Sequence, residues 1–128
     1  MILLDTHAWI WWVNEDERLS SRAHEIISHD DSVGVSVISC WEVAMLVAKQ
    51  RIGFMIDVQD WIEQALARPK LRLLQLTPKI IVSSTRLPGN FAGDPADCMI
   101  VATCLHHGVS LVSKDRKVQG YRQVNVIW

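Results

Sequence analysis

Short apolar runs that alternate with longer helix-like segments constrain the fold of this chain more than any other feature. Ile2-Leu3-Leu4 is wholly apolar and stops at Asp5, which is typical of a strand buried on both faces. Further strands are predicted at residues 33–35, 71–76, 109–112 and 124–128. Because strands that alternate with helices pair in parallel beneath those helices, the pattern predicts an α/β fold. The expected form is a three-layer α/β/α sandwich around a parallel sheet of four to five strands.

The segments between these strands begin and end with recognisable helix signals. We expect helices over residues 6–13, 21–28, 39–50, 58–68, 78–86 and 95–107, and a short helical turn after residue 115. Ser39 is expected to open the third helix, with Glu42 reaching back to the Ser39 N–H in a capping box. Thr77-Pro78 and Asp94-Pro95 each place a capping side chain before a proline in the first turn. Gly108 suits the position that follows a helix end.

Length and composition favour one folded domain over residues 1–128. A chain of 128 residues is long enough for one hydrophobic core, and its apolar fraction of 49% is that of a folded protein. It contains no internal repeat, low-complexity run or linker-like stretch. Charged residues interrupt every apolar stretch before a membrane-spanning length, so no membrane association is expected.

Cysteine usage, the chain start and the net charge narrow the class of protein further. Cys40, Cys98 and Cys104 have no metal-binding spacing, and an odd number cannot pair completely, so reduced thiols in a cytoplasm are expected. No basic segment precedes the first apolar run, as a signal peptide would require. The formal net charge of −1 argues against a strong, generic nucleic-acid binder. It allows an enzyme that contacts nucleic acid locally.

Acidic residues occur where strands are expected to end or helices to begin. They are Asp5, Glu42, the pair Asp94 and Asp97, and Asp115. The carboxyl ends of parallel strands meet at one edge of a sheet, so these side chains converge if the first and fourth strands flank the reversal of strand order. An all-oxygen pocket of carboxylates favours Mg²⁺ or Mn²⁺ over zinc. Such a metal site suggests phosphodiester chemistry.

Each acid taken alone also has a structural explanation as a helix cap. Asp5 and Asp94, for example, directly precede expected helices, and an acid in a first turn gains about 0.3–1 kcal/mol from the helix dipole. However, the hydroxyls of Thr6, Ser39 and Ser113 are also available for capping. Capping alone therefore does not explain why so many acids stand at these positions.

Four segments of the chain, in their order and spacing, resemble one known family. They are Leu4-Asp5-Thr6-His7, Ser39-Cys40-Trp41-Glu42, Asp94-Pro95-Ala96-Asp97 followed by Ile100-Val101-Ala102-Thr103, and Val112-Ser113-Lys114-Asp115. Together they resemble the PIN-domain ribonucleases, and more narrowly the VapC-type toxins of bacterial toxin–antitoxin pairs. Each motif alone is weak, whereas the four in register along the whole chain are specific.

The resemblance implies a PIN-like fold and a metal-dependent endoribonuclease that hydrolyses RNA phosphodiesters, as the toxin of a type II toxin–antitoxin pair. By position, Asp5, Glu42 and Asp97 match the core acids of the family, and Asp115 matches its fourth. These four are expected to be catalytic and to hold one or two Mg²⁺ or Mn²⁺ ions. Asp94 matches a more structural acid, which would contribute weakly or indirectly to the metal site.

Residues beside the acids complete the site that the resemblance implies. Thr6 and Ser113 match hydroxyl positions next to the acids, and Thr6 would hold Asp5 or a metal-bound water in place. Cys98 departs from the family, since many relatives carry arginine at this position. The implied partners are an RNA substrate, a cognate antitoxin protein and a second copy of the chain in a homodimer.

Several aromatic and basic side chains have both a structural and a functional interpretation. Tryptophans at positions 9, 11 and 12 cannot all point one way on a helix, so at least one is expected to be exposed or at an interface. His7 could touch the site, although packing or a surface role is the more ordinary explanation. The basic residues that could line an RNA path, if they are more than scattered surface charge, are Arg51, Lys79, Arg86, Lys114 and Arg116.

Three alternative functions fit parts of the pattern. A haloacid-dehalogenase-like phosphatase needs a second aspartate two residues after the first, where this chain has His7. A receiver-type signalling module needs an acid after the third strand, where this chain has Gln75-Leu76-Thr77. A non-catalytic PIN-like module that binds protein or RNA would show a missing acid, and none is missing. This binding module stays as the alternative to the nuclease.

Overall fold

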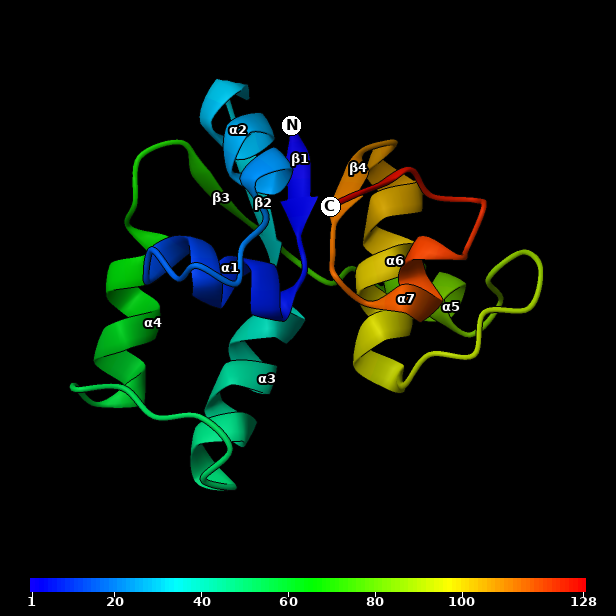
Figure 1. Ribbon diagram of the computed structural model, residues 1–128. Coiled ribbons are helices and arrows are strands. Elements are labelled where there is room, and N and C mark those ends of the chain that lie inside the picture. The colour runs from blue at the N-terminus through cyan, green and yellow to red at the C-terminus, as the bar shows by residue number, and fades with distance from the viewer.

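Five short strands form one parallel sheet at the centre of the molecule. The computed structural model describes residues 1–128 and arranges the strands in the order β3-β2-β1-β4-β5 (Figure 1). The strands are β1 Ile2–Leu4, β2 Val33–Ser36, β3 Leu71–Leu74, β4 Ser110–Val112 and β5 Val126–Ile127. Every neighbouring pair is parallel, and strand order reverses between β1 and β4, where Leu4 is the register partner of Val112. The predicted α/β fold and the position of the reversal are confirmed.

Helices cover both faces of the sheet and make the outer two layers. The helices on one side are α1 Thr6–Val13, α2 Ser21–His29, α3 Val37–Ala48 and α4 Val58–Leu66, and those on the other are α5 Pro78–Ser84, α6 Pro95–His107 and α7 Arg116–Gln119 (Figure 1). Parallel neighbours need crossover connections, which these helices supply, and the crossovers bury both sheet faces. No helix is both long and apolar enough to cross a membrane.

Alternation along β1 divides the core between the two sheet faces. Ile2 and Leu4 belong to the larger cluster of 16 buried residues, which they share with side chains of α1, α2, α3 and α4. Leu3 belongs to a second cluster of 8 buried residues, where it meets Ile100 and Val101 of α6. Successive side chains of a strand face opposite sides of the sheet, which explains the division. The burial of all three residues confirms the strand that the apolar run predicts.

The start of α3 differs from the sequence prediction. The helix begins at Val37 because β2 runs directly into it, and the Ser36 hydroxyl accepts a hydrogen bond from the Ile38 N–H at 3.3 Å. Ser39 is therefore the third residue of the helix, and it is fully buried. The predicted capping box between Ser39 and Glu42 is wrong. Glu42 lies beyond the first turn, so its side chain is free to face another element.

Aspartates, not hydroxyl side chains, cap the helices that follow β1 and β4. Asp5 is the N-cap of α1 and Asp115 is the N-cap of α7. The Thr6 and Ser113 hydroxyls, which are also available for capping, do not cap these helices, and both side chains are buried. Asp5 and Asp115 therefore do cap helices, as the structural explanation proposed. Both caps lie at the sheet edge where the sequence predicts a metal site.

Other element boundaries shift by a few residues. Gly108 follows α6 in the left-handed conformation with φ of 63°, as predicted. The last strand is shorter than expected because only Val126 and Ile127 pair with β4. β3 ends at Leu74, and α3 ends before Gln50, which takes a left-handed φ of 57°.

The tryptophans of α1 are more buried than the sequence predicts. Trp9 is fully buried, Trp11 is 9% exposed and Trp12 is half-buried, so no ring of the three is exposed. Trp9 packs edge-on against Trp61 of α4, with 5.2 Å between the ring centroids. Trp11 meets the C-terminal Trp128 at 5.8 Å. Different sides of α1 are therefore covered by different parts of the chain, which lets one helix bury adjacent rings.

Candidate functional site

One cavity at the carboxyl ends of β1 and β4 gathers the acids that the sequence singles out. It has a volume of about 460 Å³. Its lining consists of Asp5, Thr6, His7, Trp11, Glu42, Asp94, Asp97, Ile100, Lys114 and Asp115. Asp5 directly follows β1 and Asp115 follows β4 by a few residues, so the reversal of strand order brings both to one edge. The structure brings together all four predicted catalytic acids, and Asp94 with them.

Three aspartates of this acidic cavity are also helix N-caps. One carboxylate oxygen of each accepts a backbone N–H bond at 2.8 Å, and the pairs are Asp5 with Ala8, Asp94 with Asp97, and Asp115 with Lys117. The N-termini of α1, α6 and α7 therefore meet at the cavity, where free N–H groups and the helix dipoles favour negative charge. Each of these aspartates keeps a second oxygen that the cap does not use.

Glu42 is held by hydroxyl groups from α1 and α3. The Thr6 hydroxyl donates to Glu42 Oε1 at 2.5 Å, and the Thr6 oxygen lies 3.0 Å from Ser39 Oγ. A hydroxyl has one proton, so Ser39 must donate in the second bond. Ser39 and Glu42 are three residues apart and share a helix face, which is the sequence signal for this network. The sequence suggested that Thr6 supports Asp5 or a metal-bound water, and the structure gives it Glu42 as its partner.

Asp5 is linked to Asp115 through a buried serine. Burial raises the pKa of Asp5 above its ordinary value, and the charge of Asp115 raises it further. Hydrogen bonds from the Ser113 hydroxyl and the Ala8 N–H lower the pKa and so oppose this shift. Ser113 is fully buried, and its oxygen also accepts from the Asp115 N–H at 3.1 Å. One hydroxyl therefore connects the acid after β1 with the acid after β4.

Crowding of carboxylates is strongest at Asp97, in the first turn of α6. Burial, together with the charges of the other four acids in the cavity, raises the pKa of Asp97 to about 7. Burial also raises the pKa of Glu42, although its hydrogen bond from Thr6 opposes the rise. A nearby cation favours the charged forms of such groups, so these carboxylates gain from binding one.

Lys114 is the one lysine or arginine in the lining of the acidic cavity. Its Nζ atom lies 5.8 Å from the centroid of the Trp11 ring, and it makes no ion pair with the acids. Cys98, at the position where the resemblance leads us to expect arginine, is not part of the lining, and its thiol donates to the Gly93 carbonyl at 3.5 Å. The basic character of this cavity therefore depends on Lys114 and on the exposed His7.

Trp11 is the lining residue that the sequence did not assign to the site. Its ring lies 5.7 Å from the ring of His7, and both side chains face the acidic cavity. The two residues are four positions apart, which places them on one face of α1. That spacing from a residue next to Asp5 is the signal that could have identified Trp11.

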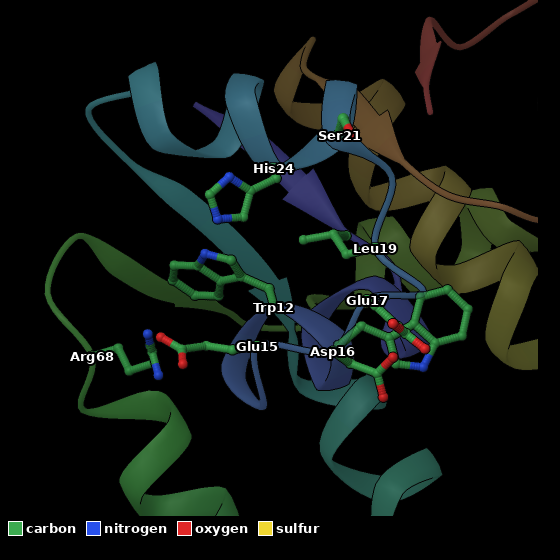
Figure 2. A pocket seen from close by; sticks show the side chains of 9 residues that line it. Trp12, Glu15, Asp16, Glu17, Leu19, Ser21, His24 and Arg68 are labelled. Carbon is green, nitrogen blue, oxygen red and sulfur yellow. The ribbon is translucent and has the colours of Figure 1, made fainter.

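A second cavity of similar size lies beside the end of α1 (Figure 2), and none of these acids lines it. It measures about 480 Å³ and includes Trp12, His24 and Arg68 in its lining. The Arg68 guanidinium lies 4.9 Å from the centroid of the Trp12 ring, and its Nη1 donates to the Val13 carbonyl at 3.2 Å. Its acidic residues come from the turn between α1 and α2 and not from strand ends. We therefore assign the functional site to the acidic cavity.

The donor set of the acidic cavity fits a divalent metal. Carboxylate oxygens are the hard ligands that Mg²⁺ and Mn²⁺ prefer. The raised pKa of Asp97 reflects its burial first and then the negative charge of the neighbouring acids. No group of three or more His, Cys, Asp or Glu side chains stands in the geometry of a metal site here. The fit therefore rests on the chemistry of the donors.

Comparison with known proteins identifies the family. The PIN domain family matches residues 2–124. Ribonuclease VapC22 of Mycobacterium tuberculosis (strain ATCC 25618 / H37Rv) is 40% identical over 121 residues, which cover 94% of this chain and 92% of that protein. The chain belongs to the PIN-domain family of VapC ribonucleases. This family is typically metal-dependent, in agreement with the donor set, and the resemblance carried by the four motifs is confirmed.

Solved structures of VapC-like proteins share this fold over nearly their whole length. A toxin–antitoxin complex from Klebsiella pneumoniae superposes with a TM-score of 0.69 at 20% identity, over 97% of this chain and 95% of that one. VapC20 of Mycobacterium tuberculosis, described as a sarcin–ricin loop cleaving toxin, gives 0.64 at 17% identity, over 98% and 99%. At such identities the likeness establishes the PIN fold alone.

Proposed function

We propose that this chain is a metal-dependent endoribonuclease that hydrolyses RNA phosphodiester bonds, as the toxin of a type II toxin–antitoxin pair. The observation that carries the proposal is the convergence of acids on one cavity where the strand order of a PIN fold reverses. The proposed catalytic acids and metal ligands are Asp5, Glu42, Asp97 and Asp115. Asp94 supports them by capping α6 beside Asp97.

The four catalytic acids would hold one or two Mg²⁺ or Mn²⁺ ions. Such an ion, when bound, lowers the pKa of a water and stabilises the charge of a leaving oxygen. The chain's own hydroxyls orient the acids, because Thr6 fixes Glu42 and Ser113 fixes Asp5. Lys114, the one lysine or arginine of this cavity, would face a phosphodiester bound there. This arrangement requires no serine or cysteine nucleophile.

Cleavage of a mixed RNA pool by the purified chain, freed of any co-purifying partner, tests this proposal. We expect cleavage with Mg²⁺ or Mn²⁺, none with EDTA, and a loss of at least about a hundredfold in Asp5→Asn. Asp31→Asn is the control, because Asp31 is exposed and lies outside the acidic cavity. Cleavage by Asp5→Asn at the wild-type rate contradicts the proposed site. If the folded wild-type chain fails to cleave RNA whichever metal is added, the result supports the alternative, a non-catalytic PIN-like binding module.

We also propose a cognate antitoxin protein as a partner, and the cytoplasm as the place of action. A solved structure with the same fold is a toxin–antitoxin complex, which supports a protein partner for this chain. An RNA substrate and the free thiols of Cys40, Cys98 and Cys104 both suit a reducing cytoplasm. If no gene next to the gene of this chain encodes a protein that inhibits its RNA cleavage, that result would count against the antitoxin.

A homodimer is the further assembly that we propose. Exposed apolar side chains gather on the adjacent helices α5 and α6, where Ile81, Val82 and Leu105 are 41%, 45% and 36% exposed. Val82 and Leu105 also line a groove of about 520 Å³ between these helices. A contiguous apolar surface of this kind favours association with another protein, and a second copy offers the same surface.

A further inference from the structure

A smaller pocket adjoins the acidic cavity and carries the opposite charge. It has a volume of about 350 Å³. Its lining consists of His7, Ile10, Trp11, Asn14, Arg18, Arg51, Ile52, Gly53 and Phe54. His7 and Trp11, about one helical turn apart on α1, line both this pocket and the acidic cavity. No acidic residue lines it, so its two arginines dominate its charge. We call it the arginine pocket.

The cavity in Figure 2 provides a contrast, because Trp11 lines it as well. Its lining carries Glu15, Asp16 and Glu17, and Arg68 points toward Glu15, away from Asp16 and Glu17 (Figure 2). These acids repel a phosphate, whereas the arginine pocket attracts one. Among the three cavities that Trp11 lines, the arginine pocket is the one that combines net positive charge with an aromatic lining.

Arg51 is placed at the pocket by the way in which α3 ends. Gln50 takes a left-handed φ of 57°, and the N–H groups of Gln50 and Arg51 donate to the carbonyls of Val47 and Leu46 at 3.0 and 2.9 Å. These two bonds form a Schellman motif, which turns the chain sharply after a helix. No carboxylate lies within ion-pair distance of the Arg51 guanidinium. Its donors are therefore free to bind an anion.

Arg18 is held in place by two neighbours. Its Nε and Nη2 atoms donate to the two carboxylate oxygens of Asp16 at 3.0 and 2.7 Å. Its guanidinium carbon lies 5.3 Å from the centroid of the Trp11 ring. These contacts fix the planar group and leave its Nη1 donors unused. Asp16 offsets part of its charge, so Arg51 contributes more of the positive potential.

Another part of the pocket lining offers an ordered aromatic ring and an amide. The Phe54 ring stacks on Trp61 with 4.3 Å between centroids and 3° between planes. Trp61 also donates from Nε1 to Asn14 Oδ1 at 3.1 Å. The Asn14 oxygen is therefore engaged, and the group that remains for a ligand is its NH₂ donor. A ring and a donor fixed in this way suit a nucleobase, which stacks and accepts hydrogen bonds.

We propose that the arginine pocket binds the RNA nucleotide next to the scissile phosphodiester. Its phosphate lies against Arg51 and Arg18, and its base lies against Phe54 within reach of Asn14. The pocket and the acidic cavity share a wall of α1, so one strand can occupy both. An acidic peptide would use the arginines and leave the aromatic ring unused, which favours RNA as the ligand. This inference rests on the ribonuclease function proposed above.

Binding of a fluorescent pool of single-stranded RNA to the slow-cleaving Asp97→Asn variant tests the phosphate contact. In that background, Arg51→Ala should weaken binding about tenfold or more, and the slope of log affinity against log salt should fall by about 0.7. Lys49→Ala is the matched control, because Lys49 is exposed on the same turn and lies outside the pocket lining. It should keep both the affinity and the slope.

Phe54→Leu tests the base contact, since leucine keeps an apolar group against Trp61. We expect RNA binding to weaken roughly fivefold to a hundredfold, the range for one lost base stack. An abasic ribose–phosphate strand should bind Phe54→Leu and the parent equally well. Circular dichroism and thermal unfolding establish that each variant is folded.

Two outcomes would overturn the proposal. One is an unchanged RNA affinity and salt slope in folded Arg51→Ala. The other is a loss confined to an acidic polyglutamate peptide, with RNA binding intact, which would make the pocket a protein-docking site. Metal-dependent cleavage by the wild-type chain separates these results from failure of the ribonuclease function. A chain that cleaves RNA while Arg51→Ala binds it normally remains a nuclease and loses only this subsite.

Discussion

At the scale of single residues, Asp97 couples the acidic cavity to the stability of the chain. Its pKa is about 7 in the folded state, against an ordinary value of 3.8. Between these values the folded state keeps a proton that the unfolded state has released, so this stabilisation is present at low pH and lost as pH rises through about 7. Asp97→Asn should therefore stabilise the metal-free protein at neutral pH, by about 1–2 kcal/mol once solvent screening of this partly exposed carboxylate is allowed for.

Chemical denaturation in EDTA at about pH 5 and about pH 8 measures this effect. The wild type should lose stability between the two, and Asp97→Asn should lose less. The raised pKa values of Asp5 and Glu42 act in the same direction and leave part of the slope in the variant. Asp31→Asn, at an exposed position, should follow the wild type. The same pH dependence in wild type and Asp97→Asn would contradict the raised pKa.

Thr6 shows how a buried hydroxyl can matter through the acid that it holds. Thr6→Val keeps the side-chain shape and removes the link between Glu42 and Ser39. We expect a stability loss of about 1–3 kcal/mol from the unpaired groups, and a cleavage loss of about tenfold to a hundredfold. Thr6→Ser should recover most of both, as measured by denaturation and RNA cleavage. A stability loss with normal cleavage would make the network purely structural.

At the scale of helices and strands, a boundary can be predicted from sequence when residues beside it determine the turn. A boundary that depends on pairing with a distant strand cannot. Asp94-Pro95 and Gly108 mark the two ends of α6 by local rules, and the structure agrees. Ser36 and Ser39 both precede apolar residues and either could cap a helix. Pairing of Ser36 with Leu74 extends β2 and decides between them. That pairing joins distant parts of the chain, so no local pattern contains it.

The end of α6 gives a direct test of backbone conformation. A Cβ added at Gly108 meets no atom within 4 Å, but φ there is +63°. Gly108→Ala should therefore cost about 1 kcal/mol from backbone strain without any clash. Gly53 is the comparison, because an added Cβ there also meets no atom within 4 Å but the residue has no positive φ. Gly53→Ala should therefore be neutral or stabilising by about 0.4–1 kcal/mol. Thermal unfolding compares them, and equal costs would contradict the strain argument.

At the scale of the whole molecule, the apolar surface on α5 and α6 makes assembly testable. Val82 is 45% exposed there, so Val82→Glu should place a charge in the proposed homodimer interface. We expect sedimentation to show a dimer for the wild type and a monomer for Val82→Glu, with cleavage chemistry intact at saturating RNA. Gln59→Glu, at an exposed position of α4, is the control and should stay dimeric. A wild type that is monomeric at every concentration contradicts the homodimer.

The acidic cavity could be predicted because Asp5 and Asp115 follow strands, and a parallel topology fixes where strand ends meet. Asp5 and Asp115 are far apart in sequence, and the β1–β4 pairing alone joins them. Strand order does not predict the arginine pocket, because Arg51 follows a helix and its position depends on the turn at Gln50. Strand order also does not predict the place of Trp11 in the cavity lining, because the Trp11 ring packs against the C-terminal Trp128. Sequence therefore predicted the charges at strand ends and missed contacts set by loops and termini.

Metal binding should act on the stability of the entire chain, because the four proposed catalytic acids come from separate elements and meet only in the folded state. Mg²⁺ or Mn²⁺ at about a hundred times the dissociation constant should add about 2.7 kcal/mol to the free energy of unfolding. The gain should be larger at about pH 8 than at about pH 6, since Asp97 must lose its proton to bind a cation.

Thermal unfolding with added metal, against NaCl at matched ionic strength, measures this gain. Asp5→Asn should lose most of it, while Asp31→Asn should keep it, because only Asp5 lines the acidic cavity. An equal gain in both variants would place the bound ion elsewhere on the chain. A gain that vanishes with Asp5 and grows with pH would instead place the ion in the acidic cavity, where burial and the neighbouring acids raise the pKa of Asp97.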